Sequence, residues 1–255
     1  MKLTFLGTGT SQGVPIIACR CEVCVSNDHR DKRLRTSALV TVENKVLAID
    51  AGPDFRQQML RAKVDVLDAI LFTHEHKDHV GGLDDIRAYN WVLKRPMDLY
   101  ADSRVQLAIM REMPYVFVEK KYPGVPQVTM HLIDNEPFYV EGIKVIPILA
   151  YHYKLPVFGF RINDLTYITD ANFIHETELE KIKGSKVLVI NALRYEKHIS
   201  HFTVSEALEI VEKVKPERAY LTHFSHQLGI HAEVEKLMPE NVFLAYDELV
   251  VEIDD

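Results

Sequence analysis

Three histidines and one aspartate fall within six consecutive positions of the stretch LFTHEHKDHVGG, residues 71–82. Imidazole nitrogens and carboxylate oxygens are ligands for divalent metals such as zinc and manganese, and catalytic sites keep a position open for water. Four such groups together are hard to satisfy in a folded chain without a shared partner, so they predict a metal site. The simpler alternative is a polar loop that is rich in histidine. The four residues are His74, His76, Asp78 and His79.

The residues before this stretch predict how the ligands are held. Residues 69–72 are uniformly apolar, which is typical of a buried strand. His74 and His76 are two positions apart, so in extended backbone they project to the same side and can reach one cation. Asp78 and His79 follow after a turn and can reach a second. Because α/β proteins build sites where strands end, we expect the ligands in a loop at the sheet edge.

Three later residues close apolar runs in the same way. His152 follows KVIPILAY, Asp170 follows LTYIT and His223 follows AYLT. Each is expected at the end of a strand, and parallel neighbouring strands would bring all three to one rim of a sheet. A single histidine at a strand end is more often a satisfied polar group than a ligand. The coincidence of three such positions with the first cluster favours a shared metal centre.

The pattern H-x-H-x-D-H, followed downstream by His, Asp and His, resembles the metallo-β-lactamase-fold hydrolases. The resemblance implies an α/β fold, the four-layer αββα sandwich, and two divalent metal ions, zinc or manganese, in the active site. All seven ligand positions of that pattern are filled in this chain. The implied ligands are His74, His76 and His152 for the first metal, Asp78, His79 and His223 for the second, and Asp170 bridging both.

Three cysteines form a second cluster within the stretch CRCEVC. Their odd number and close spacing do not suit a disulfide framework. Thiolates at C-x-C-x-x-C spacing suit a structural zinc that needs a fourth ligand, and the alternative is that they are small buried hydrophobes or free thiols. We expect a closed tetrahedral site that clamps the loop after the first strand to the active-site loop. Its ligands are Cys19, Cys21, Cys24 and His226.

The opening FLGTGTSQGVP, the cysteine stretch and THFSHQ together resemble one branch of that fold, the PhnP-like phosphoribosyl cyclic phosphate phosphodiesterases. The resemblance runs from Leu3 to about Glu252 and implies a comparable structural zinc and a homodimer. It also implies hydrolysis of a small cyclic or nucleotide-like phosphate diester. The expected nucleophile is a hydroxide generated by the two metals, which lower the pKa of water toward about 7.

A further histidine is a candidate proton donor for the leaving alkoxide. His201 lies two residues before Thr203, which with Glu206 predicts a capping box at the start of a helix over residues 204–214. A helix amino terminus favours anions, and the PhnP-like resemblance implies a general-acid histidine in this H-x-T context. His201 and the ligand Asp78 are therefore the predicted catalytic residues. His198 is the second choice, and a hydrogen-bonding role in a loop is the simpler alternative.

The composition is that of a globular protein, with 47% hydrophobic and 26% charged residues among 255. No linker or low-complexity tract divides the chain, so residues 1–255 are expected to form a single domain, with two sheets between helices. No signal segment and no run of about 18 apolar residues is found, so we expect a cytoplasmic protein without a membrane partner. Strands are expected at 2–6, 37–42, 46–50, 69–73, 99–101, 128–133, 143–149, 157–162, 166–169, 187–190, 219–222 and 249–253, and helices at 53–61, 83–92, 104–112, 176–182, 204–214 and 232–238.

The formal net charge of −7 argues against a large nucleic-acid surface. The basic run RDKRLR, residues 30–35, is expected to be a solvated loop, although it could attract phosphate. The glycine-rich loop at residues 7–13 either presents amides to a phosphate or only permits a tight turn. The alternatives to a phosphodiesterase are an RNA- or DNA-end nuclease of the same fold, an enzyme that hydrolyses lactams or thioesters, and a metal-binding scaffold without turnover.

Replacing His201 with alanine should leave the metal content intact and lower turnover by about 10² to 10⁴ fold, because only a proton donor is lost. Replacing Asp78 or His79 should abolish metal loading and activity together. Steady-state kinetics and elemental analysis of the same preparations measure both quantities. Activity equal to wild type in the His201→Ala variant would remove His201 from the mechanism.

Overall fold

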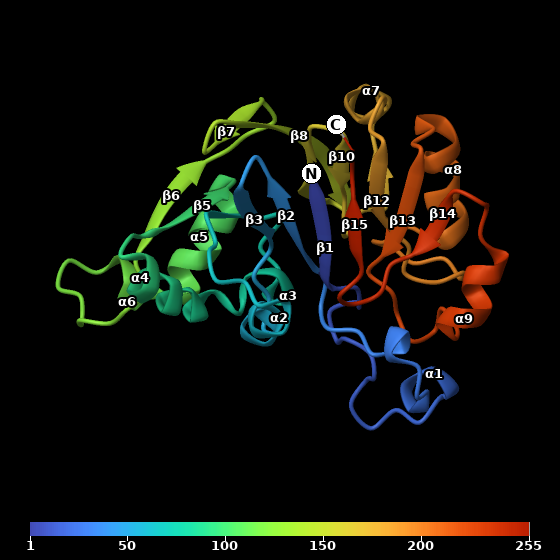
Figure 1. Ribbon diagram of the computed structural model, residues 1–255, viewed down its shortest axis with the longest axis horizontal. Coiled ribbons are helices and arrows are strands. Elements are labelled where there is room, and N and C mark those ends of the chain that lie inside the picture. The colour runs from blue at the N-terminus through green and yellow to red at the C-terminus, as the bar shows by residue number, and fades with distance from the viewer. Residues whose placement is uncertain (255) are drawn as a thin grey trace.

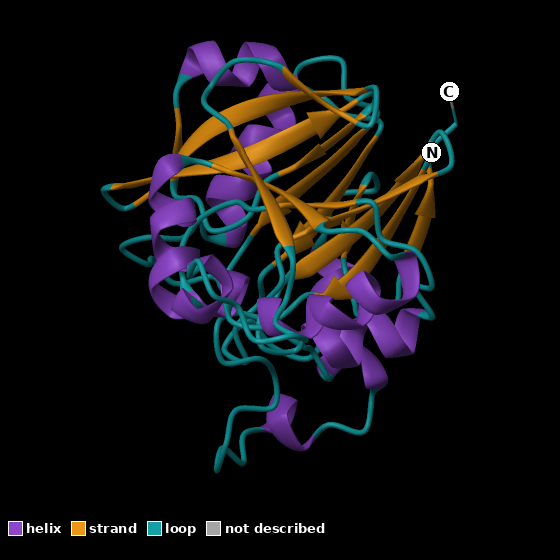
Figure 2. Ribbon diagram, turned by 90° about the vertical axis from the view of Figure 1, so that its left-hand side faces the viewer, coloured by secondary structure: helices purple, strands orange, loops and turns teal. Residues whose placement is uncertain are grey.

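Two β-sheets pack face to face with helices on both outer sides in the computed structural model, which describes residues 1–254 (Figures 1 and 2). The first sheet combines an antiparallel part at one edge with a parallel part from β3 to β6. Its strands, in spatial order, are β15 (Val250–Glu252), β1 (Lys2–Gly7), β2 (Ser37–Val42), β3 (Lys45–Ile49), β4 (Ala69–Leu71), β5 (Met97–Ala101) and β6 (Val128–Leu132).

The second sheet has the same mixed character. Strands β8, β9 and β10 are antiparallel neighbours, while β10, β12, β13 and β14 run parallel. The spatial order is β11 (Phe173–Ile174), β8 (Ile143–His152), β9 (Leu155–Ile162), β10 (Leu165–Tyr167), β12 (Val187–Asn191), β13 (Arg218–Thr222) and β14 (Val242–Leu244), and β7 (Phe138–Val140) pairs with β8.

Helices cover the outer face of each sheet, as Figure 2 shows. On the first sheet lie α2 (Phe55–Ala62), α3 (Lys77–Val80), α4 (Arg87–Leu93), α5 (Ser103–Glu112), α6 (Pro114–Phe117) and the 3₁₀ turn Leu83–Ile86. On the second lie α7 (Glu176–Ile182), α8 (Val204–Val214) and α9 (His231–Val234), and α9 runs into the 3₁₀ turn Glu235–Leu237. The loop with α1 (Glu22–Val25) and the 3₁₀ turn His29–Asp31 projects from one end (Figure 2).

The strands are apolar on both faces because each face meets a different core. Ala69 and Leu71 of β4 point into the core between the sheets, whereas Ile70 and the following Phe72 point into the core under the helices. Successive side chains of a strand alternate between faces, so a strand in the middle layer must be apolar throughout. This alternation explains the uniform run at residues 69–72 and places the chain that follows it at the sheet edge.

The predicted αββα sandwich is confirmed, and so is the helix over residues 204–214. Its capping box is complete, since the Thr203 hydroxyl accepts from the Glu206 amide and the Glu206 carboxylate accepts from the Thr203 amide. The sequence patterns missed the shortest elements, which are held by tertiary contacts more than by their own periodicity. One of these is α3, a single helical turn where a loop was predicted for Asp78 and His79. The missed strands and other short helices are β7, β11, β14, α1 and α6.

The basic run at residues 30–35 is not the solvated loop that was predicted. The Arg33 guanidinium is buried and donates to the Thr8 hydroxyl at 2.9 Å and the Ala245 carbonyl at 2.7 Å. Arg30 and Arg35 form ion pairs with Asp28 and Asp54 respectively. The charges are therefore compensated inside the protein, where acidic and polar partners offset the cost of burying them.

Most backbone amides of the glycine-rich loop at residues 7–13 already donate within the protein. The amides of Gly9, Thr10 and Gly13 donate to the carbonyls of Leu34, Phe224 and Thr10. The Thr8 amide donates to Asp247. These bonds favour the turn and anchoring role of the loop. Separately, among residues 1–254 no helix has the length and apolar character of a membrane span.

Replacing Thr203 with alanine should lower the free energy of unfolding by about 1 kcal/mol, because α8 loses its side-chain cap. Urea titration followed by circular dichroism measures the change. The control Glu212→Ala alters an exposed position of the same helix and should change stability by less than about 0.5 kcal/mol. Unfolding curves that coincide for Thr203→Ala and wild type would contradict the role of the cap.

Candidate metal centre

The seven predicted metal ligands come together at one end of the two sheets. His74 and His76 follow β4, and α3 carries Asp78 and His79. The His74 ring centroid lies 4.1 Å from that of His79 and 4.6 Å from that of His76. The second sheet supplies the remaining three from its own strand ends, and β8, which ends at His152, runs antiparallel to β9 rather than as a parallel neighbour. These three are His152 after β8, Asp170 after β10 and His223 after β13.

The tightest groupings of ligand atoms differ from the two sets that the resemblance implies. One group joins His74, His79 and Asp170, and the other joins His152, Asp170 and His201, with all ligand atoms of a group within 4.8 Å of one another. Asp170 belongs to both groups, in keeping with a bridging position. The His76 ring is exposed and lies 5.1 Å from the His152 ring, at the mouth of the centre.

His74, His79 and His223 are each held by the Nδ1 atom of the ring, which leaves Nε2 to face the centre. The Nε2 atoms of His74, His79 and His223 are buried and make no hydrogen bond, and that of His79 lies 3.2 Å from the carboxylates of both Asp78 and Asp170. Such orphaned atoms are costly in a protein interior unless a ligand satisfies them. A metal ion would do so, because a ligating imidazole typically donates its other N–H to a neighbouring group. The Nδ1 contacts are His74 with Thr73 Oγ1 at 3.0 Å, His79 with Asp50 Oδ2 at 2.7 Å and His223 with Thr36 Oγ1 at 3.0 Å.

Asp50 orients two of these histidines at once. Its carboxylate accepts from the Thr73 amide at 2.9 Å and the Thr73 hydroxyl at 2.8 Å as well as from His79. The Thr73 hydroxyl thus donates its hydrogen to Asp50, and its oxygen can accept a hydrogen bond from the Nδ1–H of His74. Asp50 was not among the predicted site residues. The signal was present, because Asp50 closes the apolar run VLAI just as Asp170 closes LTYIT.

The backbone of the centre adopts conformations that side chains usually avoid. Asp50, Asp170 and His223 have φ values of 64°, 54° and 61°. Residues in this left-handed region typically cost about 1–3 kcal/mol each and cluster at functional sites. Gly52 permits a further close approach, since a Cβ there would lie 1.9 Å from the Asp78 carbonyl oxygen. The helical turn α3, which carries Asp78 and His79, therefore packs directly on the backbone after β3.

The charges of the centre favour a cation. Burial alone would lower the pKa of His79, but the carboxylates of Asp170, Asp50 and Asp78 raise it well above its usual value. Burial acts to raise the pKa of Asp170, but His223 and His79 hold it well below its usual value. Carboxylates that stay ionised when buried need a positive partner, and a divalent ion supplies more charge than an imidazolium.

His201 lies inside the same centre. Its ring centroid is 4.6 Å from that of His152 and 4.8 Å from that of His223. Burial, followed by the nearby His223, lowers the pKa of His201 to about 2, so this imidazole is neutral in the protein without bound ions. His198, the second choice for the general acid, is half-buried, with its ring centroid 5.0 Å from that of His201. The geometry thus brings His201, rather than His198, against the predicted ligands.

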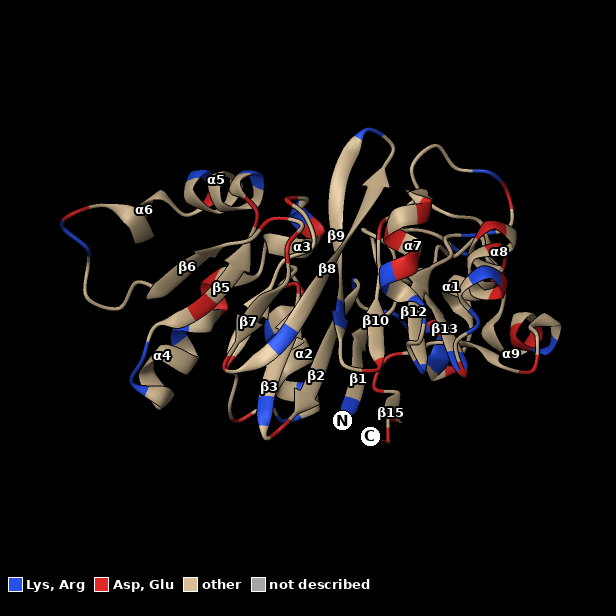
Figure 3. Cartoon of the chain, turned by 90° about the horizontal axis from the view of Figure 1, so that it is seen from above, with Lys and Arg blue, Asp and Glu red and all other residues tan. Residues whose placement is uncertain are grey.

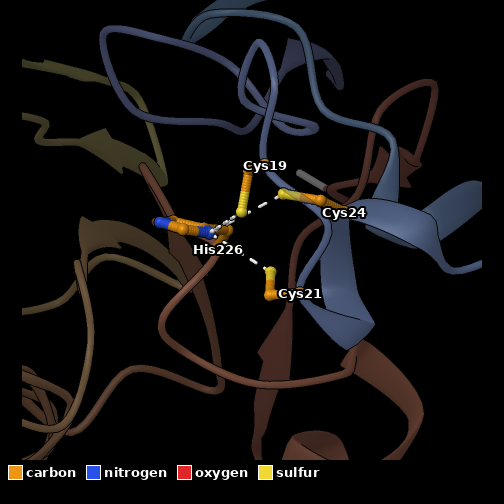
Figure 4. Close-up of side chains that lie close together, drawn as sticks. All are labelled: Cys19, Cys21, Cys24 and His226. Atoms are coloured by element: carbon orange, nitrogen blue, oxygen red, sulfur yellow. Dashed lines mark hydrogen bonds between the residues drawn. The ribbon is translucent and has the colours of Figure 1, made fainter.

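The three cysteines surround one histidine nitrogen, as Figure 4 shows. The Sγ atoms of Cys19, Cys21 and Cys24 lie 3.4, 3.3 and 3.6 Å from Nδ1 of His226. A hydrogen bond from the Cys24 backbone lowers the pKa of Cys21 to about 6, which favours the thiolate that binds metal. Burial raises the pKa of Cys24 to about 11, a direction that zinc would reverse. Three sulfurs and one imidazole at this spacing fit a closed tetrahedral zinc site.

Comparison with known proteins identifies relatives of the whole chain. Residues 45–224 match the family model described as "Beta-lactamase superfamily domain". An octanoyltransferase of Porphyromonas gingivalis is 40% identical over 258 residues, covering all of this chain and 52% of that protein. A ribonuclease Z of Nanoarchaeum equitans is 27% identical over 169 residues, covering 63% of this chain and 53% of that protein. The chain spans about half the length of these curated relatives.

One solved structure matches nearly the whole of this chain. The crystal structure of a new diphosphatase from the PhnP family superposes with a TM-score of 0.93 at 36% sequence identity. The match covers 99% of this chain and 98% of that chain. The fold, the order of its elements and a third of the residues are thus shared with that diphosphatase.

Replacing Cys21 with serine should remove one zinc ion per chain and leave the metal of the histidine cluster in place, because a hydroxyl is a poor substitute for a thiolate ligand. The complementary change Asp170→Asn should remove metal from the histidine cluster and leave the zinc of the cysteine cluster in place. Elemental analysis of both purified variants, with circular dichroism to verify folding, measures the loss. If either variant lost the metal of both clusters while still folded, the two sites would not be independent.

Proposed function

The chain belongs to the beta-lactamase superfamily and, within it, to the PhnP family, and we propose on that basis that it is a metal-dependent phosphodiesterase for small phosphate diesters. The carrying observation is that His74, His79 and the buried Asp170 place ligand atoms within 4.8 Å of one another, beside further histidines whose buried ring nitrogens have no hydrogen-bond partner. Imidazole and carboxylate donors with an open side suit zinc or manganese in a hydrolytic site. The full-length match to a PhnP-family diphosphatase favours phosphorus chemistry over acyl chemistry.

Seven side chains would hold the two active-site ions, and the cysteine cluster would hold a structural zinc. Divalent ions, when bound, supply Lewis acidity that lowers the pKa of water and neutralises charge on phosphoryl oxygens. Asp50 fixes the orientation of His74 and His79 through the hydrogen bonds described above. We carry over the ion sets that the resemblance implies, in which His74, His76 and His152 would hold one ion, Asp78, His79 and His223 would hold the other, and Asp170 would contribute to both.

His201 is proposed as the general acid. Its neutral imidazole keeps one N–H, and its Nδ1 lies 3.9 Å from Asp170 Oδ1. An anionic phosphate ester beside the ring would raise the pKa of His201, because a nearby negative charge favours the protonated form. The residue can then hold a proton until the leaving oxygen takes it. His198→Ala is the matched control for His201→Ala, since His198 lies one ring further from the ligands.

The names of the relatives suggest two alternatives to a phosphodiesterase, a nuclease and an acyl-transfer enzyme. The ribonuclease Z relative makes a nuclease the first alternative. However, this chain is acidic, and Arg30 and Arg35 of its basic run are paired with Asp28 and Asp54. Lys and Arg are also interspersed with Asp and Glu along α5, α7 and α8 (Figure 3). The second alternative is acyl chemistry, because one relative is named an octanoyltransferase, although the match covers only 52% of that protein. An acyl substrate is therefore included in the substrate panel. The homodimer implied by the resemblance and the cytoplasmic location stay predictions.

A substrate panel tests the proposed function. The purified chain, loaded with zinc or manganese, should hydrolyse bis(p-nitrophenyl) phosphate and ribose cyclic phosphates, and chelation should abolish the activity because the ions supply the Lewis acid. A tRNA precursor, nitrocefin and an octanoyl thioester serve as comparisons. Faster turnover of any of these three than of the diesters would contradict the proposal. Inactivity on every substrate, with metals shown bound, would favour a scaffold.

A further inference from the structure

A pocket of about 530 Å³ opens beside the histidine cluster. Its lining includes the predicted ligands His76 and His152, together with residues 153–155 and 199–200. One wall is thus the tip of the β8–β9 hairpin, and the other is the loop between β12 and α8 that leads to His201. A volume of this size falls within the range of about 300–1,000 Å³ that is usual for small-molecule sites. The pocket can hold the part of a substrate that extends beyond the scissile phosphate.

The hairpin wall carries a strained aromatic residue. Tyr153 is the first of the two residues that join β8 to β9, and its φ is 60°. A positive φ at that position of a hairpin turn favours glycine, and a bulky side chain there is a backbone outlier. About half of the Tyr153 surface is exposed, so burial of the ring does not offset the strain. A strained residue beside a candidate active site points to a functional use of its side chain.

Asn172 locks the two walls of the pocket to each other. Its Oδ1 accepts from the Tyr153 amide at 2.7 Å, and its Nδ2 donates to the Ile199 carbonyl at 3.2 Å. His152 adds a second tie, because its Nδ1 donates to the Ser200 carbonyl at 2.9 Å. Both walls are therefore fixed relative to a predicted metal ligand. Such preorganisation lowers the entropy cost of binding a ligand in the pocket.

The chemistry of the walls selects a flat ligand with negative charge. Tyr153 presents its ring, and Ile199 across the pocket is 65% exposed, so two large apolar surfaces face water without a ligand. Lys154 is exposed and its Nζ lies 5.3 Å from the Tyr153 ring centroid. Aromatic faces bind planar rings by stacking, and a neighbouring ammonium group favours an anion. These features together match a nucleotide more closely than an aliphatic phosphate ester.

We propose that this pocket binds the planar ring of a nucleotide-like phosphate ester against Tyr153, with Lys154 beside its negative charge. The inference rests on the proposed phosphodiesterase function and specifies its substrate class. It makes Tyr153 and Lys154 specificity residues, while the reaction itself stays with the metal centre. Removal of Tyr153 should then alter which esters are preferred rather than whether the metal is held.

Tyr153→Gly is the informative variant, because glycine removes the ring and also relieves the positive φ. The substrates are adenosine 2′,3′-cyclic phosphate and glycerol 1,2-cyclic phosphate, which share a five-membered cyclic phosphate and differ in the base. The ratio of their kcat/KM values should fall at least about tenfold in the variant, as expected for the loss of one stacking contact. Asn163→Gly changes the equivalent turn residue of the β9–β10 hairpin, at φ 50°, and should leave the ratio unchanged.

A binding measurement separates this inference from the proposed function. Calorimetric titration of the metal-loaded protein with adenosine 5′-monophosphate and with ribose 5-phosphate needs no turnover. Wild type should bind the first at least about tenfold more tightly, and Tyr153→Gly should lose that preference. Equal dissociation constants in wild type, or an undiminished preference in Tyr153→Gly and in Tyr153→Asn, would overturn the inference. Inactive protein that keeps the preference would refute the phosphodiesterase and retain the pocket.

Discussion

The buried carboxylate of Asp50 fixes the direction in which two of the predicted metal ligands, His74 and His79, point. It accepts three hydrogen bonds, two from Thr73 and one from His79. Its position follows from the parallel pairing of β3 with β4, since the Asp50 amide donates to the Leu71 carbonyl at 2.9 Å. The strand pairing thus places the carboxylate, and the carboxylate orients the imidazole of His79 directly and that of His74 through the Thr73 hydroxyl. Without this chain of contacts, the ligand pattern in the sequence would not become a site.

The same arrangement explains why the centre needs ions. The apolar middle layer holds Asp50, Asp170 and the rings of His74, His79 and His223 away from water. Ionised carboxylates in such surroundings carry a large desolvation cost unless a cation compensates it. The fold supplies donors from both sheets, so an ion bound there also ties the two halves of the sandwich. In the same way, a zinc ion bound by the cysteine cluster would join the projecting loop to the segment after β13.

Many residues of the metal centre could be predicted from the residue types at the ends of apolar runs in the sequence. A polar residue that closes an apolar run identified His152, Asp170 and His223, and the same rule applied to VLAID would have found Asp50. Tyr153 and Asn172 could not be found in this way. Their roles depend on a hairpin tip meeting a loop about 45 residues later in the chain, which no local pattern encodes. The one-turn helix α3 was missed for a different reason, since its four residues are too few to show helical periodicity.

The account depends on metal ions held by side chains of both sheets. Crystals of metal-loaded protein, measured at the absorption edge of the added metal, would locate those ions directly in an anomalous difference map. The account predicts two peaks within coordination distance of the Nε2 atoms of His74, His79 and His223, separate from a zinc peak among the three cysteines. A map with density at the cysteines alone, from protein reloaded with excess metal, would contradict it.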